Sequence, residues 1–567
     1  MPRLPSLRTA RRSFVSTTLT ATLVASLAAC ADPAASPGEP GPDAGVLEPD
    51  AAQPLPAAFR ISLVGERLPI LAGGTATVEV RVDRAETFAG AVTVTVDHLP
   101  AGVSADALTI GAGSVSGTLT LRAAATAAHS LPTAVGVRGQ AVGGEDHDVT
   151  AAIVTVIGTP GALDTSFGAT GGKVVVPAGI SDDTGLAVAV QPDGKVLIAG
   201  RAAEHLGDFA LVRLERDGAL DATFGTGGRV LTDLAGAADA VHAIALQPDG
   251  KIVVAGVTTT AATGNDFAVA RYLPDGRLDA SFGTGGTVIT AVGPDADAAY
   301  AIALQADGKI VVGGDSSRGA SQTGVDYALV RYTATGALDA GFGTGGVVLT
   351  PIAASGGRDS IYALATQFID GEERIVAAGG EGDFSAARYR ATGALDASFG
   401  SGGKVARMLG STIGAARAIA IGPNNVITLA GHGHHDVALA QLTVGGTLDV
   451  GFGAGGTTIT KLSVTNWDEA QALVREPDGG LVVAGWVYEG GSSAGNFAVL
   501  RYGAAGALDA RFGTGGTAII PVAAGSKADQ AMAVTVQPDD RVPTRRIVAA
   551  GWASDSNTDL AVIRVWQ

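Results

Sequence analysis

The chain of 567 residues is poor in cysteine and in aromatic side chains, and its acidic residues outnumber its basic ones. Cys30 is the only cysteine, which excludes an internal disulfide and any metal site built from several thiolates. Aromatic residues make up 5 % of the chain, and 38 basic against 55 acidic residues give a net charge of −17. We therefore expect neither nucleic acid nor an anionic membrane surface as a partner. Glycine is abundant instead, with 82 residues, as is typical of short strands joined by tight turns.

Residues 1–30 are predicted to be a targeting segment. Four arginines precede an apolar stretch at 14–27, and Leu27-Ala28-Ala29-Cys30 closes it. The tetrapeptide resembles the lipobox of bacterial lipoproteins, which implies a lipid on Cys30; an ordinary cleaved signal is the alternative. Arg11-Arg12 also resembles a twin-arginine signal, so Sec and twin-arginine export both stay open.

This leader predicts the location of the protein. Past it, no apolar run approaches the roughly 18 residues that a membrane-spanning helix needs. We therefore expect a lipid-anchored protein of the bacterial cell envelope that touches the membrane through Cys30 alone. Ala31 replaces the aspartate that retains some lipoproteins at the inner membrane, which favours the outer membrane.

Two segments separate the leader from the rest of the chain. Residues 31–57 hold seven prolines and five acidic residues with no basic residue, which predicts an extended linker. Residues 58–158 alternate apolar and polar side chains, as in Thr77–Val82, and about seven short strands over this length predict a β-sandwich. Leu99–Val103 resembles the strand-linking loop of bacterial immunoglobulin-like modules, which implies a small Ig-like β-sandwich.

An internal repeat fills residues 159–567. LDxxFG followed by GG occurs seven times, 53 to 60 residues apart, with its phenylalanine at Phe167, Phe224, Phe282, Phe342, Phe399, Phe452 and Phe512. A period of this size indicates a solenoid, a propeller or an array. We interpret each unit as four short strands, which in the second unit are 229–231, 243–246, 252–255 and 267–271. Seven such units predict an all-β fold with a seven-bladed β-propeller after the sandwich.

The motifs of the repeat also carry a resemblance. LDxxFGxGG, QPDGKIVVAG and DFAVxRY together resemble the delta-60 repeat, a bacterial family described as a predicted propeller of unknown function. The resemblance covers about residues 161–567. It implies a fold and no activity.

An arginine and an aspartate recur eight residues apart in the repeats. We hypothesise that each pair hydrogen-bonds and fixes the connection between blades; two independently solvated charges are the alternative. Arg564 has no aspartate after it and Asp164 has no arginine before it, so residues 163–168 are predicted to complete the last blade. The predicted pairs are Arg213 and Asp221, Arg271 and Asp279, Arg331 and Asp339, Arg388 and Asp396, Arg501 and Asp509, and Arg564 and Asp164, while Gln441 replaces the arginine before Asp449.

The copies differ in one set of connections. The Pro-Asp-Gly turn and LDxxFGxGG are predicted to share one face of the ring, and the variable connections the other, which is the usual layout of a binding surface. Drift of unconstrained loops is an equally good explanation. The variable connections contain Trp467, Trp486 and Trp552, with Tyr488 beside them, and these four are candidate ligand-binding residues. Packing of Trp486 and Trp552 between blades is the alternative.

Two further groups could bind a metal. His432, His434, His435 and Asp436 occur together in one unit and offer ligands to zinc or another divalent ion. An aspartate precedes the second predicted strand of six units, where a turn or cap role is favoured over weak calcium sites. These residues are Asp183, Asp239, Asp297, Asp359, Asp468 and Asp529.

Two hypotheses for the function follow. The first is a monomeric, non-catalytic scaffold, anchored in the envelope, that binds a protein or a glycan through the variable face or the central channel. The second is an exported propeller enzyme, a metal-assisted lyase or a lactonase-like hydrolase, with its site at the channel. We favour the first and expect no cofactor, with a divalent metal at the histidines left open.

Overall fold

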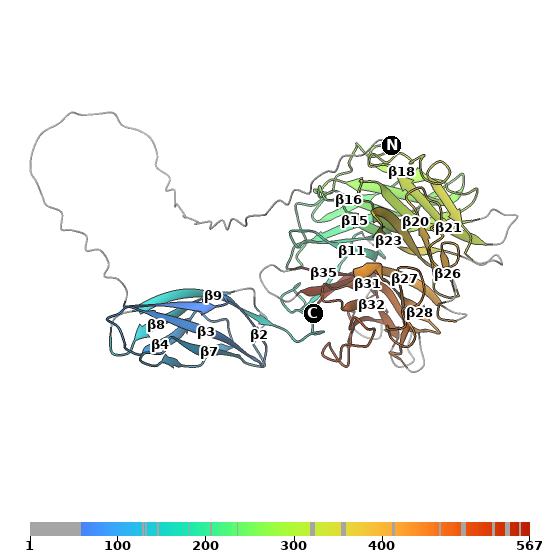
Figure 1. The fold of residues 1–567 in the computed structure, drawn as a ribbon. Helices are drawn as coiled ribbons and strands as arrows, with labels where there is room; N and C mark the ends of the chain where they lie inside the picture. Colours follow the sequence, from blue (N-terminus) through green and yellow to red (C-terminus); the bar gives the residue numbers. More distant parts are fainter. Residues whose placement is uncertain are drawn as a thin grey trace, which may run out of the picture. The chain divides into compact units, whose positions relative to one another are not determined.

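The structure is a computed structural model that describes residues 58–567, apart from short gaps (Figure 1). The predicted leader with Cys30 and the linker lie outside the described residues. In the described part, helical structure consists of one 3-10 turn, Pro423–Asn425, and no helix is long and apolar enough to cross a membrane. The prediction of an all-β fold is confirmed. The gaps are 128–129, 131–132, 145–146, 180, 204–206, 235, 237, 318–323, 353–358, 381, 407, 411–413, 464–466, 489–494, 524–527, 539–544 and 555–556.

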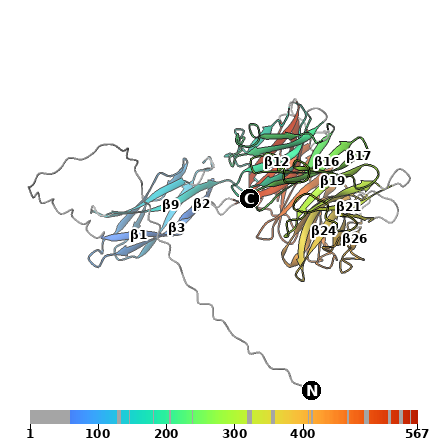
Figure 2. The ribbon, with the colours of Figure 1, turned by 90° about the horizontal axis from the view of Figure 1, so that it is seen from above.

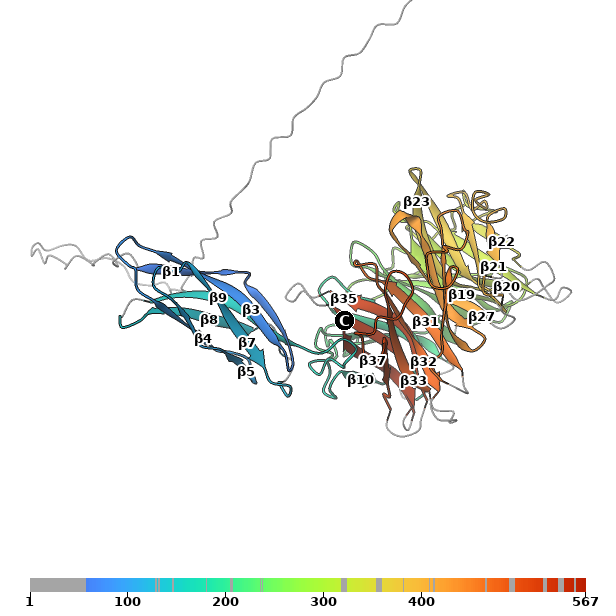
Figure 3. The same ribbon diagram turned by 60° about the horizontal axis from the view of Figure 1, so that its bottom comes forward.

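Residues 59–157 form two sheets, in the orders β1-β3-β7-β5 and β2-β9-β8-β4-β6 (Figure 3). The alternation in β3 buries Val78, Val80 and Val82 in the core, because successive side chains of a strand point to opposite faces. The strands are β1 (Phe59–Val64), β2 (Arg67–Leu71), β3 (Thr75–Arg84), β4 (Val92–Asp97), β5 (Val103–Ala105), β6 (Leu108–Ile110), β7 (Ser116–Ala123), β8 (Thr133–Ala141) and β9 (His147–Ile157).

The described residues of this region form nine strands, where the sequence predicted about seven. β2 contains Pro69 and pairs in parallel with β9 at the edge of its sheet. Proline cannot donate to a ladder, so it is tolerated at such an edge, and its presence hid this strand from the sequence pattern. β5 and β6 have three residues each, too few to show a period.

The repeat region contains seven four-stranded antiparallel sheets in the described residues. In hydrogen-bonded order they are β11 to β14 (Thr184–Val190, Val196–Ala202, Asp208–Leu214, Arg229–Thr232), β15 to β18 (Asp239–Leu246, Ile252–Thr260, Gly264–Tyr272, Thr287–Thr290), β19 to β22 (Asp297–Leu304, Ile310–Ser317, Val325–Tyr332, Val347–Thr350), β23 to β26 (Ile361–Ile369, Glu372–Gly379, Ser385–Tyr389, Lys404–Ala406), β27 to β30 (Gly414–Ile421, Ile427–Gly433, Asp436–Leu442, Thr457–Thr460), β31 to β34 (Asp468–Arg475, Leu481–Tyr488, Gly495–Tyr502, Thr517–Ile520), and β35 (Asp529–Gln537), β36 (Arg546–Ser554) and β37 (Thr558–Trp566) with β10 (Lys173–Val176).

The first strands of these sheets contact one another in a closed circuit. β11 contacts β15, and the series continues through β19, β23, β27, β31 and β35 back to β11. The sheets follow one another in chain order (Figure 1 and Figure 2). In the last sheet, β10 comes from the start of the repeat region and pairs with the C-terminal β37 (Figure 3).

The middle strands of each sheet are apolar on both faces, because each sheet packs between two neighbours. In β16, Ile252 and Val254 pack toward the preceding sheet, whereas Val253 and Ala255 pack toward the following one. This arrangement explains why IVVAG and DFAV lack the alternation of a strand with one solvent-exposed face.

The strand order corrects the predicted units by one strand. The segment 229–231, interpreted as the first strand of the second unit, lies in β14 and pairs with β13 of the preceding sheet. LDxxFG therefore connects the third and fourth strands of one sheet rather than two blades. The internal period fixes the repeat length but not where a unit begins, and this is why the phase was wrong. The division into two groups of connections is unaffected, since alternate connections of an antiparallel sheet lie at the same end.

The three repeated motifs meet at the arginine of the third strand. Arg271 Nε donates to Asp279 Oδ2 at 2.9 Å, and its Cζ lies 4.6 Å from the centroid of the Phe282 ring. Nη1 of the same arginine donates to Ala334 O of the next sheet at 2.5 Å. Lys251, from QPDGK, places its Nζ 3.6 Å from Asp279 Oδ2. Both members of the central pair are buried, so the motifs build one polar network between sheets.

The same contacts recur with small changes. The Nε to Oδ2 distance is 2.6 Å for Arg213 and Asp221, and 2.9 Å both for Arg331 and Asp339 and for Arg388 and Asp396. Arg501 differs, because it bonds Glu476 Oε2 at 2.8 Å as well as Asp509.

Gln441 has no such pair. Its Nε2 donates to Thr428 Oγ1 at 2.9 Å, while Asp449 Oδ1 accepts from the backbone of Gly451.

The two ends of the repeat region meet in the last copy of this network. Asp164 Oδ2 accepts from Arg564 Nε and from Arg546 Nε, each at 2.9 Å, and Nη1 of Arg564 donates to Arg216 O at 2.6 Å. Leu163 forms a bridge with Val565, while the strand that pairs with β37 is β10. The segment 163–168 is thus the connection of the last sheet, and β10 is its fourth strand.

The glycine of the turn after each third strand permits close contact between sheets. Gly276 has a φ of +91°, and a Cβ there would lie 2.9 Å from the Phe224 ring and 3.1 Å from Gly225 N of the preceding sheet. Gly225 N donates to Asp275 O at 2.9 Å. A side chain at this turn would meet both a strained backbone and a clash.

Replacing Asp164 with alanine is expected to lower the free energy of unfolding by about 3–5 kcal/mol, because Arg564 and Arg546 stay buried without a counter-charge. Urea unfolding followed by circular dichroism measures the loss. The control is Asp249→Ala, which removes a half-exposed partner of Lys251 and should cost under about 1 kcal/mol. Equal losses in the two variants would contradict the role of the buried pair.

Candidate functional site

The residues of the repeated motifs are engaged in contacts within and between sheets, so few of them are available to bind a ligand or to act in catalysis. Three shallow clefts lie beside LDxxFG connections, and each includes the turn glycine of the next sheet, Gly218, Gly276 or Gly336. Because the clefts recur with the motif, we attribute them to the inter-sheet contact. A functional site is therefore sought where the sheets differ.

In six of the seven described sheets, an aspartate directly before or at the start of the first strand binds the backbone of the preceding link, and β27 begins with Gly414 instead. Asp297 Oδ2 accepts from Val292 N at 2.7 Å and from Gly293 N at 2.8 Å. Asp183, Asp359, Asp468 and Asp529 accept backbone N–H groups at the equivalent place. The carboxylates thus hold a turn, as the favoured interpretation of the sequence had it.

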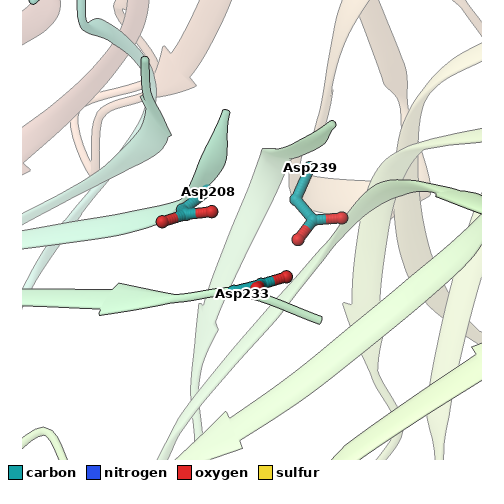
Figure 4. A group of neighbouring side chains, drawn as sticks. All are labelled: Asp208, Asp233 and Asp239. Atoms are coloured by element: carbon teal, nitrogen blue, oxygen red, sulfur yellow. The ribbon is translucent and has the colours of Figure 1, made fainter. Parts of the chain in front are cut away.

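One of these aspartates belongs to an acidic group. Asp208 on β13, Asp233 after β14 and Asp239 at the start of β15 bring one carboxylate oxygen each within 4.8 Å of the others (Figure 4). Asp239 Oδ2 also accepts from Leu234 N at 2.8 Å. Burial raises the pKa of Asp239, and the charges of Asp233 and Asp208 act in the same direction. The sequence analysis missed Asp208 and Asp233, whose proximity depends on the packing of two sheets.

The histidines of the predicted metal group point to different partners. His432 is the second-last residue of β28, and its Nδ1 lies 3.0 Å from Glu469 Oε1. His434 and His435 form the turn to β29, with φ of 54° and 74°, and Asp436 begins β29. In the described part of the chain, the group of three or more convergent acidic, histidine or cysteine ligands is the one at Asp239, and it includes none of these four residues.

Two of these histidines join a second set of side chains, which we call the Glu469 cluster: Arg417, His432, His435, Trp467 and Glu469. Arg417 Nε donates to Glu469 Oε1 at 3.0 Å. The centroid of the His435 ring lies 3.8 Å from that of Trp467, and the His432 ring lies 6.3 Å from it. The cluster joins the sheets β27 to β30 and β31 to β34 at the end where the variable connections lie.

Glu469 is the unusual member of the cluster, because it is a carboxylate that is only 7 % exposed. Burial alone would raise its pKa, but the contacts and charges of His432 and Arg417 outweigh burial and hold the pKa below its ordinary value. Glu469 is therefore ionised at neutral pH. The same place in the other sheets carries uncharged residues: Thr184, Ala240, Ala298, Ser360, Ala415 and Gln530.

The four predicted aromatic residues differ in exposure. Trp467 is 43 % exposed, whereas Trp486 is 7 % exposed and its ring centroid lies 4.8 Å from that of Tyr488. Trp552 is half-buried on β36. Trp486 thus matches the alternative of packing, and Trp467 is the ring best placed to meet a ligand.

A row of half-buried side chains lies on the first strands, where each strand has a register shift against the second. We call it the bulge row; its members are Leu186, His242, Tyr300, Tyr362, Arg417, Gln471 and Met532. The ring centroids of His242 and Tyr300 are 5.1 Å apart and those of Tyr300 and Tyr362 are 5.4 Å apart. Arg417 Cζ lies 4.1 Å from the centroid of Tyr362. Burial lowers the pKa of His242 to about 4, so this ring is neutral at pH 7.

The sequence carries a signal for the bulge row. In six units the residue lies three positions after the repeated aspartate and directly before an alanine, as His242 follows Asp239. Among these six copies the position carries leucine, histidine, tyrosine twice, glutamine and methionine, whereas the aspartate and the alanine on either side are constant. Together, the bulge row and the Glu469 cluster offer stacking faces, an oriented guanidinium and an ionised carboxylate.

The repeats resemble a known protein family. Residues 191–224, 247–282, 305–342 and 476–512 match the family model described as "Domain of unknown function (DUF5122) beta-propeller". The repeats are therefore similar to a β-propeller family to which no activity is assigned. No curated protein matches the sequence.

Solved structures show only distant similarity. A protein of unknown function from Porphyromonas gingivalis W83 is 13 % identical, with 37 % of this chain and 92 % of that chain covered and a TM-score of 0.15. A DUF4784 family protein from Bacteroides caccae ATCC 43185 is 9 % identical, with 87 % and 93 % covered and a TM-score of 0.22. Domains 4–9 of the surface layer protein SbsC are 11 % identical, with 89 % and 81 % covered and a TM-score of 0.14. TM-scores this low carry no argument.

Asp239→Asn is expected to change the free energy of unfolding at pH 7.5 by less than about 1 kcal/mol, because the amide oxygen can still accept from Leu234 N. Asp239→Ala leaves that N–H unpaired and should cost about 1–3 kcal/mol. The folded pKa of Asp239 lies above its ordinary value of 3.8. The free energy of unfolding of the wild type should therefore rise relative to that of the Asn variant as the pH falls from 7.5 to 4.5. Urea unfolding at both pH values measures this. Asp193→Asn, in an exposed turn, is the control. If the free energy of unfolding of the wild type falls relative to that of Asp239→Asn over this pH range, the account is contradicted.

Proposed function

We propose that the chain is a non-catalytic binding protein of the bacterial cell envelope, whose seven-bladed β-propeller binds a protein or glycan ligand. The proposal takes the seven sheets as blades and the bulge row as part of the wall of a central channel. The closed circuit of first strands supports this arrangement. In the proposed arrangement, residues 159–567 form the propeller, and the protein is a monomer.

The observation that carries the binding role is the contrast between the two ends of the sheets. At one end lie the Pro-Asp-Gly turns and LDxxFG connections, which the inter-sheet network uses in nearly every repeat. At the other end, single-copy residues meet across two sheets, since the His435 ring lies against Trp467 and His432 lies against Glu469. A rigid scaffold with single-copy aromatic and charged groups at one end is suited to recognition.

The N-terminal parts fit the same role. We propose that residues 1–30 export the protein, that Cys30 carries the lipid, with the outer membrane favoured, and that residues 31–57 are a linker. The two-sheet region within residues 58–158 serves as an Ig-like spacer that sets the propeller apart from the membrane. The enzyme alternative, a lyase or hydrolase with a metal at the histidines, stays a prediction that metal analysis of the purified protein would test.

Trp467→Ala is expected to weaken ligand binding at least tenfold, because an exposed ring at a binding surface supplies contact area that alanine cannot. Binding is measured on an array of neutral and acidic bacterial polysaccharides, with an array of envelope proteins alongside. The matched control is Phe368→Ala, a ring that is 59 % exposed at the opposite end of the sheets, next to the first turn of its sheet. Equal effects of both substitutions, or no binding to either array, would remove the proposal.

Cys30→Ser is expected to move the protein from the membrane fraction to the soluble fraction, because the thiol that accepts the lipid is absent. Cell fractionation and labelling with a radioactive fatty acid measure both changes. The control is Ser36→Ala, six residues beyond the cysteine, which should leave labelling unchanged. A Cys30→Ser protein that is still labelled and still sediments with membranes would refute lipid anchoring at this residue.

A further inference from the structure

The bulge row and the Glu469 cluster share Arg417 and so form one continuous path of contacts. The path runs from His242 through the rings of Tyr300 and Tyr362 to Arg417 and then to Glu469. Its members come from five consecutive sheets. A row of this kind suits an extended ligand better than a single small molecule.

Arg417 is held in one orientation by two different contacts. The Tyr362 ring lies against its guanidinium, with 4.1 Å from Cζ to the centroid, and Nε donates to Glu469 Oε1 at 3.0 Å. The Nδ1 atom of His432 lies 3.0 Å from Oε1 of the same carboxylate. Stacking and a hydrogen bond together remove most of the rotational freedom of a long side chain. The arginine is therefore ordered before any ligand arrives.

The end of the guanidinium is left for a ligand. Among the described residues, the hydrogen-bond acceptor of Arg417 is Glu469 at Nε, and Nη1 and Nη2 have no acceptor. The side chain is 27 % exposed. Two parallel N–H groups on a fixed plane match the two oxygens of a carboxylate, which lysine cannot reproduce. Five third-strand arginines donate instead to an aspartate and to a backbone carbonyl: Arg213, Arg271, Arg331, Arg388 and Arg564. Arg501 donates to carboxylates alone in the described residues.

We propose that Arg417, with Tyr362 and Tyr300, binds the carboxylate and the sugar ring of a uronic acid residue in an acidic glycan. The inference rests on the proposed binding function and names its ligand class. A sugar presents apolar C–H faces to the tyrosine rings and hydroxyl groups to the polar edges of the tyrosines and of the neutral His242. Gln471, the next member of the bulge row, adds an amide donor and acceptor. An acidic peptide shares the carboxylate but lacks the repeating rings, and a row of aromatic side chains favours the sugar.

The charges of Arg417 and Glu469 determine which interactions can contribute to the affinity for a ligand. Glu469 already compensates much of the charge of Arg417, and the chain as a whole carries −17. Affinity must therefore come from the paired N–H groups and from stacking, with little help from long-range attraction. Binding is expected to need both the free carboxylate and the sugar ring.

Isothermal titration calorimetry of the full chain in detergent tests the proposal, with trigalacturonate and trimannuronate as probes. We expect at least one of them to bind, its methyl ester to bind at least tenfold more weakly, and Arg417→Met to weaken binding at least tenfold. Arg417→Lys keeps a positive charge beside Glu469, so it is expected to fold. Its affinity for the uronate should still fall at least fivefold. Arg511→Met, which removes an 84 % exposed arginine beside an LDxxFG connection, is the control and should change nothing.

Three outcomes overturn the inference. Neither uronate binds; a uronate binds equally well to the Arg417 variants; or poly-glutamate binds through Arg417 at least as tightly as the uronates, which points to an acidic peptide. Failure here is distinguishable from failure of the proposed function. If the polysaccharide or protein array still shows binding that depends on Trp467, the scaffold role stands and only the uronate site is lost.

Discussion

The guanidinium of the third-strand arginine is the group on which the repeat region depends. In four of the seven sheets it stacks on the LDxxFG phenylalanine and bonds the aspartate of its own sheet and a backbone carbonyl of the next, and the last sheet repeats this with Asp164. A buried arginine without its partners is costly, so each sheet is stable only against its neighbour. The glycine turn and the lysine of QPDGK belong to the same contact. Most of the repeated sequence is thereby explained by packing.

Within this chain, one set of residues stabilises the fold and a different set is available for recognition. Residues that recur in the sheets hold sheet to sheet, and residues that occur once are free to meet a ligand. Glu469 illustrates the second class, since a buried carboxylate there replaces small or uncharged residues, and its contacts with His432 and Arg417 hold its pKa below the ordinary value. A set of that kind costs stability unless its partners stay in place, which is a reason to assign it to binding.

Sequence patterns predicted the local features well and the contacts between sheets poorly. The offset of eight between Arg271 and Asp279 could be seen because a hairpin brings them together. The phase of the unit could not be seen, since the period is the same wherever a unit is taken to begin. Arg417 and Glu469 were missed because 52 residues separate them and only the packing of two first strands joins them. The bulge at His242 inserts an extra residue that no apolar alternation reveals.

The meeting of the two ends is the most direct test of the account. Leu163 and Val565 face each other in the bridge directly before Asp164, flanked by the bonds from Asp164 N to Arg564 O and from Trp566 N to Ala162 O. Such a non-hydrogen-bonded pair is close enough for a disulfide. In a chain carrying Cys30→Ser, Leu163→Cys and Val565→Cys, titration of free thiols after air oxidation should find none in the folded protein. Two free thiols under native conditions would contradict the closure of the sheets through the N-terminal segment.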